Sequence, residues 1–199
     1  MKKIFLILFV FFLFSLSCQK NEIRPASTPF LEFRSITQEE SAHELYANYL
    51  SIKTYFTDGD MDLGLNGILE EDKQFGLISG DPDTPEIDTI PNPLFYNYFI
   101  TGYKRENGIY KEFLSENARL NLNGRFPRLS EDRSEVLQQG PFVISKHGRW
   151  KGEIEYKIRI GPGFINEVDK DSIKFKVSIL DRAKNKSNDV VTKAIVVLD

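Results

Sequence analysis

The chain contains little cysteine, histidine or tryptophan: its 199 residues include one cysteine, two histidines and one tryptophan. A lone cysteine forms no internal disulfide, so a disulfide-stabilised fold is excluded. Neither His43 nor His147 has a cysteine or histidine neighbour at zinc-ligand spacing. Residues 4–16, the longest apolar run, fall short of the ~20 residues that a transmembrane helix needs.

An excess of basic charge is also lacking. The sequence has 26 Lys and Arg against 29 Asp and Glu, a formal net charge of -3. A mildly acidic chain lacks the basic surface that holds a phosphate backbone, so we expect no nucleic-acid partner. The hydrophobic content of 41% and the charged content of 28% are ordinary for a globular protein of one domain.

The motifs of common enzymes are missing too. There is no G-x-S-x-G nucleophile elbow, and Gly161 and Gly163 are not followed by the Lys-Ser/Thr pair of a phosphate-binding loop. Acidic residues are plentiful, so the paired carboxylates of a glycosidase stay possible. We expect a protein that is not an enzyme, with a hydrolytic enzyme as one alternative.

The N-terminus carries a distinctive pattern. Lys2 and Lys3 precede an apolar run over residues 4–14, and small residues then lead to Cys18, which is the layout of a secretory signal. With cysteine at the cleavage point, the segment resembles the bacterial lipoprotein box, although Ser15 stands where that box usually has leucine. The resemblance implies a signal peptide over residues 1–17 and lipidation of Cys18. The alternatives are an ordinary signal peptide and a transmembrane anchor.

The expected location is therefore the bacterial cell envelope, in the outer membrane, on its periplasmic or surface face. Residues 18–28 are polar, include Pro25 and show no periodic pattern, so we interpret them as a lipidated tether. The folded domain is expected over residues 29–199.

Alternation of polar and apolar residues predicts an all-β domain. In residues 151–160, Ile154, Tyr156 and Ile158 face one side and charged residues the other, and residues 172–180 repeat this pattern. Further strands are predicted at residues 50–56, 94–103 and 190–198 (the last as a central strand), with weaker ones at 30–33, 109–114 and 118–122. A short helix is predicted at residues 37–45, and residues 126–143 are expected to be a long connection.

Seven or eight short strands separated by turn signals favour an immunoglobulin-like or fibronectin-III-like β-sandwich. The Cys–Trp–Cys pattern of true immunoglobulin domains is absent, so only the architecture is inferred. A division into two domains near Asp81 is the alternative.

An acidic loop follows the strand predicted at residues 50–56. Asp58, Asp60 and Asp62 occupy alternate positions, and a curled loop lets three such carboxylates converge on one hard cation. Carboxylates packed this closely repel one another unless a cation or donors neutralise them. Leu63 and Leu69 replace the Gly and Glu of an EF-hand, so the loop is not an EF-hand. Ordinary turn chemistry is the alternative interpretation.

A second polar loop, residues 181–188, joins the last two predicted strands. In a seven-stranded sandwich this loop and the loop after the second strand lie at the same end. We therefore expect oxygens from Asp181, Asn185 or Asn188 to approach the acidic loop and complete a cation site, with Ca²⁺ as the candidate ion. The alternative is again turn chemistry.

Both loops resemble segments of a family of uncharacterised bacterial lipoproteins. Residues 55–65 (YFTDGDMDLGL) are similar to its DGDGDIGL stretch, with Met61 in place of the middle glycine. Residues 178–188 (SILDRAKNKSN) are similar to the DRAGNKSN stretch at the end of immunoglobulin-like domains, with Lys184 in place of glycine. The resemblance implies a β-sandwich lipoprotein of the cell envelope and brings no known activity.

Aromatic residues crowd the strand predicted at residues 94–103. Alternation exposes one set, which we expect to include Tyr96 and Tyr98, and exposed tyrosines suit contacts with carbohydrate or protein. In the alternative, both faces of this strand are covered. The function expected from the sequence is binding or structural, with an unidentified envelope protein or glycan as partner. The alternative is a carbohydrate-binding accessory domain.

Replacing Cys18 by serine tests the anchor. In a Gram-negative host we expect the wild-type protein in the membrane fraction and Cys18→Ser outside it or unprocessed, because serine cannot accept the thioether-linked lipid. Fractionation and the mass of the N-terminal peptide measure this, with Ser27→Ala as a control. Equal membrane association of both variants would contradict lipidation.

Overall fold

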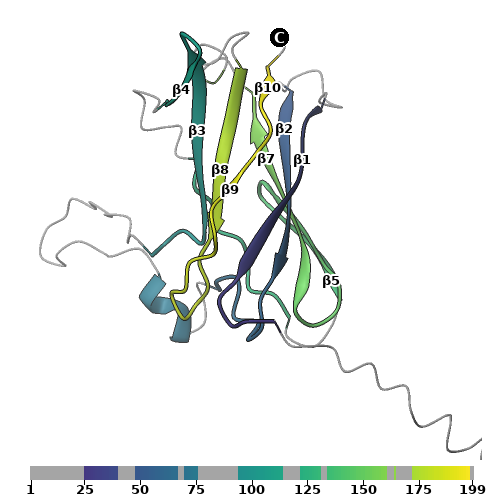
Figure 1. Ribbon diagram of the computed structural model, residues 1–199. Helices are drawn as coiled ribbons and strands as arrows, with labels where there is room; N and C mark the ends of the chain where they lie inside the picture. The colour runs from purple at the N-terminus through teal and green to yellow at the C-terminus, as the bar shows by residue number, and fades with distance from the viewer. Residues whose placement is uncertain are drawn as a thin grey trace, which may run out of the picture.

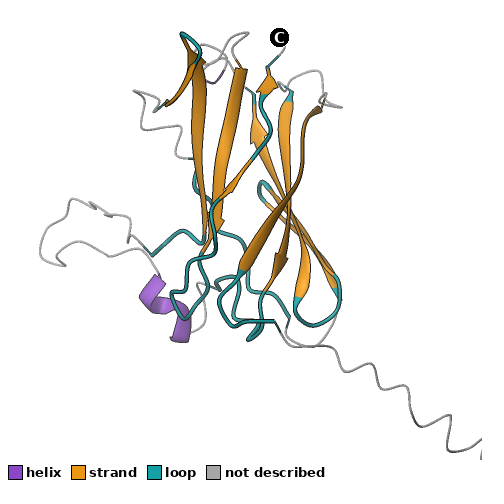
Figure 2. Ribbon diagram, in the orientation of Figure 1, coloured by secondary structure: helices purple, strands orange, loops and turns teal. Residues whose placement is uncertain are grey.

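The computed structural model describes residues 25–39, 48–66, 70–75, 94–113, 122–130, 134–160, 164 and 172–197. These residues form two antiparallel sheets that pack face to face, which confirms the predicted β-sandwich (Figures 1 and 2). The strands are β1 (Phe30–Glu39), β2 (Tyr49–Thr57), β3 (Tyr98–Glu106), β4 (Ile109–Glu112), β5 (Glu135–Gln139), β6 (Phe142–Lys146), β7 (Lys151–Arg159), β8 (Ser172–Ile179), β9 (Val190–Val191) and β10 (Ile195–Val196). A short 3₁₀ helix, η1, spans Glu70–Phe75.

The strand order is that of an immunoglobulin-type sandwich. The first sheet runs β1-β2-β7-β6-β5, and the second runs β10-β8-β3-β4 with β9 paired to β8. The chain changes sheets after β2, after β4 and after β7, as it does between the corresponding strands of that fold. The strands β5 and β4 extend the two sheets at their edges.

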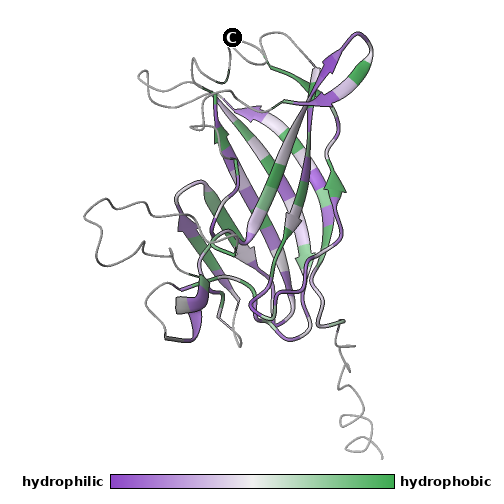
Figure 3. Cartoon of the chain, turned by 90° about the vertical axis from the view of Figure 1, so that its left-hand side faces the viewer, coloured by the Kyte–Doolittle hydropathy of each residue, from purple (hydrophilic) through white to green (hydrophobic). Residues whose placement is uncertain are grey.

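The strands form where apolar residues alternate with polar ones, and Figure 3 shows this alternation as bands along the strands. In β7, Ile154, Tyr156 and Ile158 are buried, as predicted. They lie opposite Thr54, Ile52 and Leu50 of β2 in the antiparallel register. The partners on the two strands therefore bury one continuous face, which fixes this register.

Aromatic rings hold the two sheets together at the centre of the core. Tyr98 of β3 stacks on Tyr156 of β7 with ring centroids 4.8 Å apart and meets Phe142 of β6 edge-on at 5.3 Å. Phe126 packs against Phe142 at 5.8 Å. Contacts of this kind contribute ~0.5–1.5 kcal/mol each beyond the burial of their area, so this cluster fixes how the sheets face each other.

The prediction of one long central strand at residues 190–198 is wrong in both length and position. The described part is two short strands, β9 and β10, at an edge of the second sheet. The break lies at Thr192, whose hydroxyl accepts a hydrogen bond from the backbone N–H of Phe175 at 3.0 Å and donates to the Lys193 carbonyl at 2.8 Å. The hydroxyl of Thr192 therefore satisfies backbone groups of Phe175 and Lys193 at the point where the strand pairing ends.

Three further predictions concern a helix at residues 37–45, a long connection at residues 126–143 and a strand at residues 118–122. Residues 37–39 are the end of β1, paired to β2, so the helix predicted at 37–45 is wrong there, and residues 40–45 lie outside the described part. The connection expected at residues 126–143 contains β5 and the start of β6. Of the strand predicted at residues 118–122, only Leu122 is described, and it belongs to no strand.

One end of the sandwich gathers several loops. The chain enters β1 there, β2 and β8 end there, and β3 begins there, whereas the C-terminus lies at the opposite end (Figure 1). Within the described ranges, no helix is long and apolar enough to cross a membrane.

Candidate metal centre

Asp58 comes directly after the last residue of β2 and is fully buried. Its backbone N–H donates to the carbonyl of Trp150 at 2.9 Å, which extends the β2–β7 pairing by one residue. The next N–H, of Gly59, donates to the carbonyl of Ala26 at 2.8 Å. A side chain at position 59 would overlap the Pro25 carbonyl, so residues 25 and 26 pack directly on this loop. These bonds fix the carboxylate of Asp58 in the interior.

The acidic loop then curls back on itself. Met61 has φ 61° and Gly64 has φ 84°, both in the left-handed region. A side chain at Gly64 would overlap the Pro127 carbonyl, so only glycine fits there. The buried side chain of Leu63 anchors the curl in the core. Met61 therefore adopts a backbone conformation that usually requires glycine.

The loop after β8 supplies the fourth carboxylate. Asp181 is buried, and its two oxygens accept hydrogen bonds from the backbone N–H of Asn185 at 2.7 Å and from the Asn185 side-chain amide at 2.9 Å. Lys184 has φ 69°, again a conformation that usually requires glycine. The short loop is therefore closed around Asp181.

Direct hydrogen bonds join the two loops. The backbone N–H of Arg182 donates to the Asp62 carbonyl at 3.2 Å, and the N–H of Ala183 donates to Asp62 Oδ2 at 2.8 Å. Since these bonds link positions more than a hundred residues apart, the sandwich topology brings the loops together as the sequence predicts.

The result is a four-carboxylate cluster: Asp58, Asp60, Asp62 and Asp181. One oxygen from each residue lies within 4.8 Å of the others. Asp58 and Asp181 are buried, Asp62 is half-buried and Asp60 is exposed, so the cluster lies partly inside the protein with one side toward solvent. This arrangement can hold a metal ion.

Hydrogen-bond donors satisfy only part of the cluster. Among the described residues, neither oxygen of Asp58 and not the Oδ1 atom of Asp62 meets a hydrogen-bond donor, although all three are buried. The carboxyl of Asp60 beside Asp58 can share a hydrogen bond with it only if one of the two is protonated. Buried charged oxygens without donors cost several kcal/mol, so an ionised Asp58 is strongly disfavoured unless a proton or a cation neutralises it.

Burial and mutual repulsion also shift the pKa values. Burial raises the pKa of Asp58 to about 8, and the carboxyl groups of Asp60, Asp62 and Asp181 add to this effect. Burial and the charge of Asp181 raise the pKa of Asp62 to about 6, against the smaller opposing effects of the Ala183 N–H and of Arg182. Burial also raises the pKa of Asp181, although its hydrogen bonds from Asn185 oppose that rise.

The two asparagines predicted as ligands have other contacts. Asn185 donates to Asp181, as described above, and so positions a carboxylate. Asn188 uses both polar atoms of its side chain on β1, because Oδ1 accepts from the Leu31 N–H at 2.8 Å and Nδ2 donates to the Leu31 carbonyl at 2.9 Å. Asn188 thus imitates a strand partner, and its prediction as a metal ligand is wrong.

The expectation that Tyr98 is an exposed binding residue is also wrong. Its side chain is fully buried in the aromatic core, because β3 begins at this residue and its inward positions are Tyr98 and Ile100. Tyr96 lies before the strand, is half-buried and packs edge-on against Phe95 with ring centroids 5.1 Å apart. Cys18 lies outside the described residues.

Sequence reasoning missed a second buried polar group. Asp72 of η1 is buried, and its Oδ2 atom accepts from the Asn66 N–H at 2.6 Å. The guanidinium of Arg125 donates to the carbonyls of Phe75 at 2.7 Å and Phe95 at 3.3 Å. These bonds tie η1 to the loop end of the sandwich, so their role is structural. Asp72 lies in an acidic run, and nothing in that run separates its buried residue from the exposed Glu71.

Comparison of the chain with protein-family models, with curated proteins and with solved structures gives no match. The interpretation of this centre therefore rests on its geometry and its charge.

The raised pKa values predict how stability depends on pH without a cation. Above the ordinary value of 3.8 and up to about 8, folded Asp58 binds more protons than unfolded Asp58, so the free energy of unfolding falls as pH rises through this range. We expect a loss of at least ~1 kcal/mol between about pH 5 and pH 8 in EDTA, measured by urea unfolding.

The variant Asp58→Asn keeps the shape of the side chain and cannot ionise, so it should lose most of this pH dependence. The exposed Asp189 lies outside the cluster, and Asp189→Asn should keep it. A wild-type stability that is flat or rises over the same range would contradict the electrostatic account.

Proposed function

We propose that the protein is a non-enzymatic binding module, tethered to the bacterial cell envelope through lipidated Cys18, whose loop end is stabilised by a bound calcium ion. The observation that carries this proposal is Asp58: both of its oxygens are buried, meet no hydrogen-bond donor from the described part of the chain and face three further carboxylates. A buried carboxylate without donors is rare in proteins unless a proton or a cation neutralises it.

A cation explains the arrangement better than a proton does. One proton can neutralise one of the four carboxylates, whereas the other three keep their mutual repulsion. A divalent cation at the centre attracts all four at once. The guanidinium of Arg182 acts on Asp62 from the side, yet its buried Nη1 atom has no hydrogen-bond partner among the described residues. It therefore does not replace an ion in the cluster.

The spacing and chemistry of the oxygens favour calcium. Oxygens that bind one Ca²⁺ at 2.3–2.6 Å can lie up to about 5 Å apart, which accommodates the observed 4.8 Å. Around Mg²⁺, with bonds of 2.0–2.1 Å, the limit is about 4.2 Å, so the loops would have to contract. Zinc prefers histidine and cysteine, and the cluster contains neither.

A bound ion would join three segments that are distant in the sequence. Asp58, Asp60 and Asp62 lie after β2, Asp181 lies after β8, and residues 25–26 pack on Gly59. At ~3.3–3.6 Å per residue, the eight residue-to-residue steps from Cys18 to Ala26 span at most about 29 Å. A lipid on Cys18 would therefore hold the calcium end of the sandwich toward the membrane.

The cluster suits binding better than hydrolysis. The paired carboxylates of glycosidases stand ~5–5.5 Å apart in retaining enzymes and ~6.5–9.5 Å apart in inverting ones. All four oxygens of the cluster lie within 4.8 Å, a spacing that suits a shared cation. This supports a structural or binding role for the site.

Calcium should raise the melting temperature of the mature chain, residues 18–199 with Cys18→Ser. An ion at ~100 times its Kd adds about 2.7 kcal/mol, which means several degrees for a domain of this size. Thermal unfolding in EDTA, in millimolar calcium and in millimolar magnesium measures the effect, and magnesium should produce less.

Asp60→Asn removes the charge of the exposed member of the cluster and should abolish most of the calcium-dependent rise in melting temperature. Glu112→Gln makes the same kind of change at an exposed position on β4, and should keep the rise in full. Equal melting temperatures of the wild type in EDTA and calcium would refute the proposed site.

A further inference from the structure

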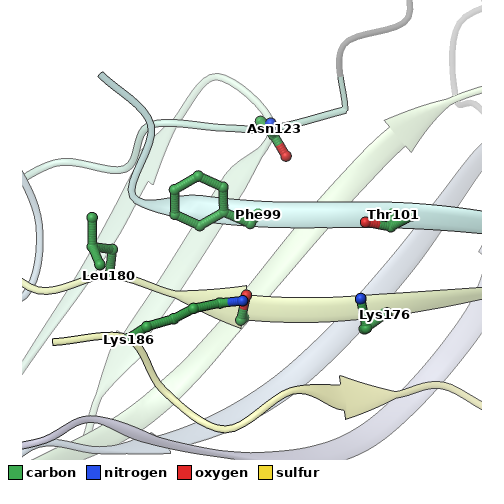
Figure 4. Close-up of a pocket in the computed structure, with 7 residues that line it drawn as sticks. Phe99, Thr101, Asn123, Lys176, Leu180 and Lys186 are labelled. Carbon is green, nitrogen blue, oxygen red and sulfur yellow. The ribbon is translucent and has the colours of Figure 1, made fainter. Parts of the chain in front are cut away.

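A second feature of the loop end is a pocket of about 360 Å³ on the outer face of the second sheet. Its volume falls in the range of small-molecule sites. Figure 4 shows Phe99 and Thr101 on β3, Lys176 and Leu180 on or after β8, and Lys186 reaching in from the following loop. The lining residues are Phe99, Thr101, Asn123, Lys176, Ser178, Leu180 and Lys186.

The antiparallel register builds this pocket. Phe99 lies directly opposite Ser178, and Thr101 lies directly opposite Lys176. The residues between them along the strands, such as Ile100 and Val177, are buried in the core. Side chains on a strand alternate between faces, so the two cross-strand pairs project together on the other side of the sheet.

Both charged side chains that line the pocket are positive, those of Lys176 and Lys186. Lys176 lies 3.9 Å and Lys186 lies 3.2 Å from the two oxygens of the same carboxylate, that of Asp189. Lys176 also interacts with Tyr103 and, more weakly, with Glu112, neither of which lines the pocket. The whole chain has a formal net charge of -3, so the charged lining of the pocket is opposite in sign to the molecule as a whole.

The other lining residues include an aromatic ring and hydroxyl groups, which are the groups that commonly contact a sugar ring. Phe99 offers a half-buried aromatic face. In the described part of the chain, no hydrogen bond engages the hydroxyl of Thr101 or of Ser178, so both can bond a ligand. Asn123 is already engaged, because its Oδ1 atom accepts from the Ile100 N–H at 3.0 Å, and it serves as a fixed wall.

We propose that this pocket binds a carboxylate-bearing sugar, a hexuronate residue of an acidic polysaccharide. The sugar ring packs against Phe99, its hydroxyl groups bond Thr101 and Ser178, and its carboxylate pairs with Lys176 and Lys186. The aromatic face and the free hydroxyls favour a sugar over a simple anion, and the lysines favour an acidic sugar over a neutral one. The inference deepens the binding role proposed above and rests on it.

The test is a titration of ¹⁵N-labelled mature chain, in calcium, with glucuronate and with glucose at matched ionic strength. We expect glucuronate to shift the amide signals of residues 99–101, 176–180 and 186 with a Kd of ~1 mM, a typical weak affinity. Glucose should bind at least ~10-fold more weakly, because it lacks the charge that pairs with the lysines.

Lys176→Met and Lys186→Met each keep the length of the side chain and remove its charge, and each should weaken glucuronate binding by at least ~5-fold. The matched control is Lys184→Met, an exposed position in the same loop that does not line the pocket, and it should bind as the wild type does.

Two results would overturn the inference. One is the absence of shifts at these amides up to ~50 mM glucuronate, where a site of ~1 mM Kd is nearly full. The other is equal weakening in all three lysine variants, which would indicate attraction by general charge. The readout is separate from that of the calcium site, which responds at Asp58–Asp62 and Asp181, so failure of one leaves the other measurable.

Discussion

The burial of Asp58 at the end of β2 is the constraint on which the loop end of this protein depends. Backbone bonds to Trp150 and Ala26 hold this segment in place from both sides, so the carboxylate cannot turn out to solvent without breaking them. It faces Asp60, Asp62 and Asp181 and meets no donor among the described residues. An unneutralised charge at Asp58 would therefore destabilise the loops that enclose it.

The other features of this end follow from that arrangement. Asp62 accepts from Ala183, which joins the loop after β2 to the loop after β8. The second of these loops also carries Lys186, a lining residue of the pocket on the outer face. Residues 25 and 26 lie on the same loop, where Ala26 accepts a hydrogen bond from Gly59. The carboxylate cluster, the pocket and this N-terminal segment thus lie at one end of the sandwich, whereas the opposite end carries the C-terminus (Figure 1).

Much of the fold can be predicted from the sequence, because alternation over residues 151–160 and 172–180 is a direct consequence of a sheet with one buried face. The sandwich topology then predicts that Asp181 meets the acidic loop. Alternation cannot set the phase of the strand predicted at residues 94–103, because its aromatic residues fall at both odd and even positions. The expectation for Tyr98 therefore placed it on the wrong face. Nor does composition indicate that the amide of Asn188 replaces a strand partner for Leu31, since asparagine suits a turn, a ligand or a strand mimic equally.

Two non-glycine residues of the loops adopt a backbone conformation that usually requires glycine. Met61 and Lys184 both have a positive φ, of 61° and 69°. This conformation costs ~1–2 kcal/mol at a residue with a side chain. Such backbone strain persists where the surrounding structure holds it in place, and it is common at functional sites.

The most direct test of the central claim is a crystal structure of the mature chain grown in calcium, with anomalous diffraction data to identify the ion. The account predicts one calcium peak among Asp58, Asp60, Asp62 and Asp181, with metal–oxygen distances of ~2.3–2.6 Å. An ordered cluster without a metal peak, with the carboxyl groups of Asp58 and Asp60 in hydrogen-bond contact, would contradict it and assign the neutralising role to a proton.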